Sequence, residues 1–556
     1  MNTRISWAVG LLILLIIPAG CDVNSLDEGV KLYVDTDFLQ HVATIQVMNA
    51  DGTGDPVDNV VLTASGTGAD QLFRLDGKKE LKPVDGFLNL GVLPGNEPSE
   101  AEPLTFTLTA RANGYITSAR AFAVIDAESP AYQSLQLVEI ANPPAGTSAS
   151  QASVSADGSG TTAAATRVQT SATTSATVDI PAGIQLLDAS GSPVGGTVQV
   201  SAVQYDPRSD ASAALPTTST QGVDANGNSL GDVFYIDPST ALGAITIEMS
   251  AGGNEVSRFS SPITVSYDVP ADLVNPATGT PYKAGDQSDV WSFDETNNRW
   301  VKETQATVVD NGGVLQATYA QSHLSTWVVG NAVPPGCFFF QATVQSGIPS
   351  SSTSQKYFYT ELEDASTNRV ISSNYLQHKN NEIITFFFVP NASANVKVYD
   401  GNETCKGNLL AEAPVGNLCS FVGALNFPTI NLDNDEIAVT TSGTCANNPD
   451  VELLPAAPIL YKDASCGPNQ WGPLAEMKSG EFTTKALTLG EQYDFSIKFG
   501  DTNFEYEDVT IETQRVTYDD GTVDININTT NTAGGTASTI DIIDVVYPAD
   551  NCSAIN

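Results

Sequence analysis

The three histidines offer little support for catalysis. His41, His323 and His378 are far apart, and the chain contains no HExxH, GxSxG or phosphate-loop pattern. Ser322 and Ser325 beside His323 could form a Ser–His pair, but a histidine that makes a buried hydrogen bond at a strand end explains them more simply. We therefore predict no catalytic residue. The enzymatic alternative is a hydrolase that uses a carboxylate pair from among the 64 acidic residues.

Aromatic side chains in the middle of the chain could bind a sugar. Trp291, Phe293 and Trp300 surround a predicted hairpin turn, and Trp327 follows in the same region. Exposed indole rings on a β-sheet stack on the C–H faces of sugars, whereas buried ones fill the core of a small sandwich. Core packing is the more ordinary use. Trp291, Trp300 and Trp327 are the candidate ligand platform.

Two acidic segments carry oxygen ligands at alternate positions. Residues 224–228 read Asp-Ala-Asn-Gly-Asn, and residues 51–55 read Asp-Gly-Thr-Gly-Asp. Neither segment matches a complete calcium loop, which has Gly at position six and Glu at position twelve. Asp-Gly and Asn-Gly are also preferred in hairpin turns. We predict turns without a metal site or cofactor, and structural calcium is the alternative.

The cysteines divide into one near the N-terminus and six within the last 220 residues. An even number in an oxidising compartment predicts up to three disulfides, among fifteen pairing schemes. The most local pair is Cys405–Cys419, and Cys445–Cys466 is the next. Zinc is disfavoured because no CxxC pair occurs and only His378 lies nearby. The candidates are Cys337, Cys405, Cys419, Cys445, Cys466 and Cys552.

The N-terminus has the pattern of an export signal. Arg4 precedes an apolar run that is too short for an ordinary membrane-spanning helix, and Pro18-Ala19-Gly20 leads to Cys21. One interpretation is an ordinary secretory signal in which the cysteine is incidental. Small residues before a cysteine also resemble the lipobox of bacterial lipoproteins, although Pro18 replaces the usual leucine. The resemblance implies removal of residues 1–20, acylation of Cys21 (palmitate) and anchoring in the envelope membrane.

The membrane leaflet stays open. Asp22 directly after the cysteine favours inner-membrane retention in enteric bacteria, a rule that other phyla do not follow. We expect a lipid-anchored protein of a bacterial cell envelope, at the outer membrane or cell surface.

Composition and patterning predict an exported β-protein. The 24 basic and 64 acidic residues give a net charge of −40, the wrong sign for binding nucleic acid. Apolar and polar residues alternate in many short runs, such as 104–110, 263–267 and 493–499. Such runs between turn residues predict an all-β fold of tandem antiparallel β-sandwiches, Ig-like or transthyretin-like.

Composition also predicts the domain boundaries. Residues 145–175 contain 7 Ser, 7 Thr and 8 Ala, which indicates a flexible linker. Pro334-Pro335 marks a second break, and the segment around Asn447 to Pro449 marks a third. The predicted sandwiches are residues 22–144, 176–332, 337–446 and 447–556, of which the last two contain the disulfides.

Three of these domains carry family resemblances. Leu104–Ala110 followed by Asn113-Gly114-Tyr115 resembles a strand and corner of carboxypeptidase-regulatory-like (transthyretin-like) sandwiches, and Leu487–Phe495 resembles a strand entry of the same family. Ile180–Gly183 and Ser322–Trp327 resemble the opening and closing segments of β-sandwich modules in bacterial surface proteins. All three resemblances imply non-catalytic modules.

We therefore predict a non-enzymatic, lipid-anchored envelope protein with a structural, adhesive or interaction role. A glycan-binding surface lipoprotein of an uptake system is the first alternative, and the secreted hydrolase is the second. The expected partners are the membrane, reached through the lipid, and an extracellular glycan or protein, but not nucleic acid.

Overall fold

The computed structural model describes residues 32–171, 174–209, 214–215, 221–230, 236, 240–295, 297, 299–332, 336–445, 448–511, 524–532 and 535–547. Cys21, Cys552 and the signal segment lie outside these residues. The described chain is all-β, as the alternating pattern predicts, and its strands form four sandwich units. No helix within this part of the chain is long and apolar enough to cross a membrane.

The first sandwich packs a four-stranded sheet, ordered β4-β5-β2-β8, on a three-stranded sheet, ordered β3-β6-β7. Apolar residues at every second position of β6, including Phe106 and Leu108, lie in the core, where Phe106 stacks on Phe122 at 5.3 Å between ring centroids. The strands are β2 (Gln40–Asn49), β3 (Val61–Ser65), β4 (Phe73–Arg74), β5 (Phe87–Val92), β6 (Leu104–Arg111), β7 (Ser118–Val124) and β8 (Ala131–Leu137).

The second sandwich is one curled thirteen-stranded sheet around a single core, with the main path β10-β11-β17-β22-β21-β20-β23-β15-β13-β9. Its terminal strands meet, because the Ser171 amide donates to Ser148 Oγ at 2.9 Å. A small separate hairpin comprises β18 (Val274–Asn275) and β19 (Thr280–Pro281). The main-path strands are β9 (Thr147–Ala156), β10 (Thr166–Ser171), β11 (Ser175–Ile180), β13 (Gly196–Tyr205), β15 (Gly243–Ala251), β17 (Arg258–Asp268), β20 (Gln287–Asp294), β21 (Arg299–Asn311), β22 (Val314–His323) and β23 (Thr326–Val329), and the side strands are β12 (Leu186–Leu187), β14 (Gln221–Val223) and β16 (Asn254–Glu255).

The predicted linker at 145–175 is wrong, because this segment forms β9 and β10 of the second sandwich. Val154, Ala156 and Val168 are buried in its core. Backbone ladders do not depend on side-chain size, and threonine favours extended backbone. A Ser/Thr/Ala-rich segment therefore forms strands once a few alternate positions are apolar.

The third sandwich pairs the sheet β27-β24-β30 with the sheet β26-β25-β28-β29. Its core includes Phe340, Phe358 and Phe427. The strands are β24 (Cys337–Ser346), β25 (Phe358–Asp364), β26 (Val370–Leu376), β27 (Ile383–Val389), β28 (Ala394–Tyr399), β29 (Leu409–Val415) and β30 (Ala424–Phe427).

The fourth sandwich combines the sheet β34-β33-β36-β37 with a sheet ordered β1-β32-β31-β39-β38, on which β35 pairs with β31. β31, which ends at Cys445, belongs to this sheet of the fourth sandwich. The domain boundary predicted at 446 is therefore wrong, and the division lies between β30 and β31. The strands are β1 (Leu32–Asp35), β31 (Glu436–Cys445), β32 (Asn448–Leu454), β33 (Ala457–Asp463), β34 (Gly472–Met477), β35 (Glu481–Thr484), β36 (Gln492–Phe499), β37 (Thr502–Thr510), β38 (Asp524–Thr532) and β39 (Gly535–Tyr547).

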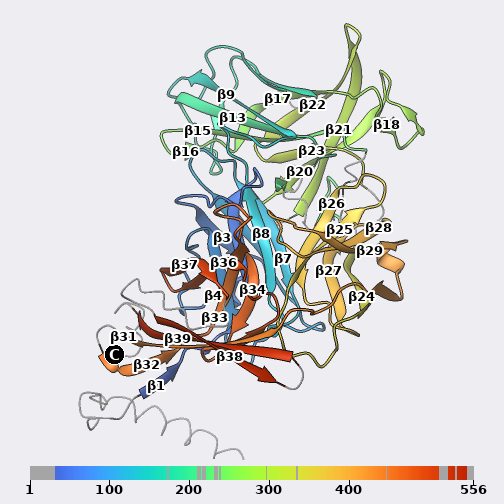
Figure 1. Cartoon of the computed structure of the whole chain (residues 1–556). Coiled ribbons are helices and arrows are strands. Elements are labelled where there is room, and N and C mark those ends of the chain that lie inside the picture. Colours follow the sequence, from blue (N-terminus) through green and yellow to red (C-terminus); the bar gives the residue numbers. More distant parts are fainter. Residues whose placement is uncertain are drawn as a thin grey trace, which may run out of the picture.

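Figure 1 shows how the units are arranged in space. The second sandwich, with β9, β13 and β17, occupies one end of the molecule. The sheet of the fourth sandwich that contains β1, β31 and β38 occupies the other end, and the first and third sandwiches lie between them.

Two disulfides form among the described cysteines. Cys337–Cys419 closes the third sandwich, and Cys405–Cys466 joins the third sandwich to the fourth. The predicted pairs Cys405–Cys419 and Cys445–Cys466 are therefore wrong. Sequence proximity is a poor guide because β24 pairs with β27 and places Cys337 opposite Val389, beside the segment that Cys419 contacts. A third disulfide stays a prediction, since Cys552 lies outside the described residues.

Candidate functional site

The three tryptophans of the candidate platform are buried, with exposed fractions of 1% for Trp291, 2% for Trp300 and 1% for Trp327. An exposed sugar-binding platform at these residues is therefore wrong. Trp327 belongs to the core of the second sandwich. Trp291 and Trp300 instead pack in a cluster that the first sandwich completes.

We call this cluster the apolar joint. Trp291, Phe293 and Trp300 of the second sandwich pack there with Ile116 and Val138 of the first. The Phe293 and Trp300 rings lie 5.3 Å apart, and Trp291 Nε1 donates to the Gly330 carbonyl at 2.9 Å. The binding partner of these aromatic side chains is thus a neighbouring domain of the same chain.

A groove of about 610 Å³ lies beside the apolar joint, where the first and second sandwiches meet. Carboxylates, hydroxyls and one histidine dominate its lining. We call it the acidic groove and describe it by Arg111, Thr117, Glu248, Ser292, Asp294, Glu295, Glu303, His323 and Ser325.

Contacts across the groove fix two of its carboxylates. Glu248 Oε1 accepts a hydrogen bond from the Thr117 amide at 2.8 Å, and burial raises the pKa of Glu248. Glu295 forms an ion pair with Arg111 at 3.1 Å. Both contacts join the first sandwich to the second, so they hold the two walls of the groove together.

The remaining carboxylates are held by the second sandwich alone. Glu303 accepts a hydrogen bond from Ser292 Oγ at 2.8 Å. Burial acts to raise the pKa of Asp294, but hydrogen bonds from Asn297 and Arg299 outweigh it and hold that pKa below its ordinary value. The groove therefore offers carboxyl and hydroxyl oxygens as acceptors to cationic or hydroxyl-bearing groups.

His323 lies on the groove wall at the end of β22. Ser322 Oγ lies 3.3 Å from His323 Nδ1, whereas Glu303 Oε1 lies 3.9 Å from Nε2. Ser322 does not line the groove. Burial lowers the pKa of His323, and its ring packs 4.9 Å from Trp327. Ser325 lines the groove, but its hydroxyl donates to the Phe293 carbonyl. The arrangement therefore fits a packing histidine better than a Ser–His nucleophile pair, which would need a hydroxyl that both faces the groove and bonds the imidazole.

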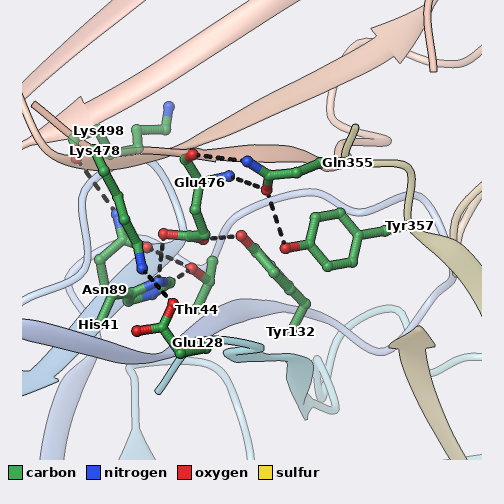
Figure 2. Close-up of polar contacts among 10 residues, drawn as sticks. All are labelled: His41, Thr44, Asn89, Glu128, Tyr132, Gln355, Tyr357, Glu476, Lys478 and Lys498. Atoms are coloured by element: carbon green, nitrogen blue, oxygen red, sulfur yellow. Dashed lines mark hydrogen bonds and ion pairs between the residues drawn. The ribbon is translucent and has the colours of Figure 1, made fainter. Parts of the chain in front are cut away.

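His41 lies in a buried network, which we call the polar junction, where the first, third and fourth sandwiches meet (Figure 2). His41 Nδ1 lies 2.8 Å from Glu476 Oε2, and His41 Nε2 lies 3.0 Å from Thr44 Oγ1. Thr44 Oγ1 donates to Asn89 Oδ1 at 3.0 Å, and Asn89 Nδ2 donates to the Lys498 carbonyl at 3.3 Å. Both ends of this series of hydrogen bonds lie in the fourth sandwich, one at Glu476 and the other at Lys498.

Tyrosine and glutamine side chains extend the polar junction into the third sandwich. Tyr132 Oη donates to Glu476 Oε1, and burial raises the pKa of Tyr132, so the phenol stays protonated. Gln355 Nε2 donates to the Glu476 carbonyl at 3.1 Å, and the Glu476 amide donates to Gln355 Oε1 at 2.9 Å. Tyr357 Oη also donates to Gln355 Oε1, at 3.3 Å (Figure 2). Glu476 thus links the first, third and fourth sandwiches.

No signal in the sequence marks the polar junction, because His41 and Glu476 are 435 positions apart and carry no motif. The remaining histidine, His378, is fully buried in the third sandwich, where Thr360 Oγ1 lies 2.7 Å from its Nε2. Desolvation lowers the pKa of His378 to about 3.

The acidic turn segments use their carboxylates within the turns. Asp224 Oδ1 accepts from the amides of Asn226 and Asn228, both at 2.9 Å. Asp51 Oδ1 accepts from the amide and hydroxyl of Thr53. Among the described residues, no group of three or more His, Cys, Asp and Glu side chains is placed to hold a metal ion.

Comparison with known proteins identifies no family for this chain. No protein-family model matches, and no curated protein matches significantly. The shaft pilin SpaA of Lactobacillus rhamnosus GG is 8% identical, with a TM-score of 0.14 over 31% of this chain and 95% of the pilin.

Two further solved structures give similar values. The Bacillus anthracis TIE protein is 9% identical (TM-score 0.13; 66% of this chain, 73% of the other). A streptococcal ancillary pilin is 10% identical (TM-score 0.13; 42% and 93%). These scores are too low to support an argument about function.

Proposed function

We propose that the chain is a non-enzymatic, lipid-anchored protein of a bacterial cell surface with a structural or adhesive role. The proposal is supported by the lipobox-like sequence before Cys21 together with four sandwiches that contact one another closely. The Cys405–Cys466 disulfide, the polar junction and the apolar joint all connect neighbouring units. Disulfides persist in oxidising compartments, which agrees with export.

Lipid anchoring is tested by replacing the acylated cysteine. Cells producing the wild type and Cys21→Ser are fed labelled palmitate and then fractionated. We expect label and membrane association for the wild type, and loss of both for Cys21→Ser. Cys552→Ser, which also removes one thiol, should keep both. A Cys21→Ser protein that remains labelled and membrane-bound would contradict the proposal.

The acidic groove supports a second candidate function, the binding of a hydroxyl-rich ligand such as a glycan. Carboxylates that are fixed by protein donors accept hydrogen bonds from sugar hydroxyls, and the Ser292 and Ser325 hydroxyls add further polar groups. The acidic groove, rather than the buried tryptophans, is then the proposed glycan-binding site.

A glycan array tests the second candidate. Wild-type binding that weakens at least tenfold in Glu303→Gln and persists in the exposed control Glu128→Gln would support it. Binding unchanged by Glu303→Gln would place the ligand elsewhere. Cleavage of a bound oligosaccharide or of a peptide panel would instead favour the hydrolase and contradict the non-enzymatic proposal.

A further inference from the structure

The first described strand belongs to the last sandwich. β1 pairs in parallel with β32, and the register places Leu32 opposite Val451 and Asp35 opposite Leu454. Thr36 extends the attachment, because its amide donates to the Leu454 carbonyl at 3.1 Å and its Oγ1 accepts from the Ala456 amide at 2.9 Å. The N-terminal chain is therefore tied to the fourth sandwich.

The segment between the proposed lipid and this strand is short. Ten residues separate Cys21 from Leu32. Even when fully extended, such a segment spans about 40 Å at most. A compact sandwich of about 110 residues has a radius of gyration near 13 Å, which corresponds to a diameter of about 35 Å. The segment can therefore span one sandwich but not a stack of two.

The second sandwich lies on the far side of this attachment. Figure 1 shows β1 and β32 at one end of the molecule and β9, β13 and β17 at the other. The contacts of the second sandwich at the apolar joint and the acidic groove are with the first sandwich. An inverted molecule, with the second sandwich against the bilayer, would require the short segment to pass at least two sandwiches.

We propose that the fourth sandwich is the membrane-facing end of the protein and that the second sandwich stands furthest from the bilayer. The proposal rests on lipid attachment at Cys21. The net charge of −40 opposes a molecule that lies flat, because anionic headgroups repel acidic surfaces within about 10 Å in physiological salt. The acidic groove then lies in the outer half of the molecule, away from the membrane.

Fluorescence quenching by labelled lipids measures this orientation. The full lipidated protein is incorporated into phosphatidylethanolamine–phosphatidylglycerol vesicles that carry a rhodamine headgroup acceptor. Donor dyes are attached to exposed positions, through Asp450→Cys beside the β1–β32 pair or through Asn311→Cys in the β21–β22 hairpin of the second sandwich. Wild-type protein carried through the same labelling corrects for native thiols.

We expect at least threefold stronger quenching of the donor at position 450 than of the donor at position 311. Equal quenching, as in a molecule lying flat, or stronger quenching at 311 would overturn the orientation. Vesicle flotation separates this failure from failure of the anchor. Protein that floats with vesicles but shows equal quenching is anchored with another orientation, whereas protein that does not float contradicts the lipid anchor itself and the orientation that rests on it.

Discussion

Two of the contacts that the first sandwich makes with its neighbours, the apolar joint and the polar junction, are held by different forces. The apolar joint to the second sandwich depends on aromatic area, with Trp291 and Trp300 packed on Ile116. The polar junction to the third and fourth sandwiches depends on directed bonds that converge on Glu476, and a disulfide joins the third sandwich to the fourth. Apolar contacts are non-directional, whereas a hydrogen-bond network is satisfied in one arrangement.

The difference separates two mechanical roles. The first, third and fourth sandwiches form a block in which the directed bonds of the polar junction are accompanied by apolar contacts, such as Phe87 with Trp471, and by the Cys405–Cys466 disulfide. The second sandwich is attached to that block mainly by the buried apolar side chains of the apolar joint. The acidic groove lies open next to this contact.

The largest effect is expected from Glu476→Ala at the polar junction. Removing this carboxylate leaves the buried His41 and Tyr132 without their shared acceptor. Each buried polar group left without its partner costs about 1–3 kcal/mol, so the two together should lower the unfolding free energy by about 2–6 kcal/mol. Urea unfolding followed by Trp471 fluorescence would measure it, since Trp471 packs on Phe87 between the first and fourth sandwiches. A loss below 1 kcal/mol would mean that water replaces the carboxylate easily.

Trp300→Ala should weaken the apolar joint by about 3 kcal/mol. This value is at the lower end of the cost for truncating a buried tryptophan, because a cavity between two domains can partly close. Calorimetry should then resolve an earlier, separate transition of the second sandwich, while the transition of the other three is unchanged. Val309→Ala, an exposed position of the same strand β21, is the control. A single, uniformly lowered transition would contradict the division into two mechanical units.

The double variant Cys405→Ala/Cys466→Ala should destabilise the third and fourth sandwiches by about 2–4 kcal/mol, because it releases a bridge across 61 positions. The transition of the second sandwich should stay in place. Peptide mapping without reduction would first confirm the Cys405–Cys466 bridge. A map showing Cys405 with Cys419 would overturn the pairing.

The smallest effect is expected from Arg111→Ala. Its ion pair with Glu295 is 3.1 Å long, but the two side chains are 44% and 34% exposed. Exposed pairs contribute less than about 1 kcal/mol. The unfolding free energy should change little, and any change should vanish in high salt. A loss above about 2 kcal/mol would show that this ion pair stabilises the contact far more than an exposed pair ordinarily does.

The fold was predictable because alternation is a local signal. Leu104, Phe106 and Leu108 of β6 occupy buried positions as their spacing predicts. The linker predicted at residues 145–175 rested on composition alone, although Val154 and Ala156 already show the strand period.

The sites were less predictable because they depend on contacts between distant segments. Trp300 is buried by packing with residues of the first sandwich such as Ile116 and Val138, and His41 is hydrogen-bonded to Glu476. Neither partner is marked by a motif. The disulfide pairs likewise follow from which strands become neighbours, and a single sequence does not disclose that.

The parallel pairing of β1 with β32 also constrains the order in which the protein matures. Thr36 is bonded to Leu454, 418 positions later in the chain. During export the first strand emerges long before its partner, and loop closure over such a distance is slow and entropically costly. We expect the first strand to dock only after β32 has been delivered, so that its pairing edge stays unprotected while the first three sandwiches emerge. Docking of this strand would then report that the fourth sandwich has begun to assemble.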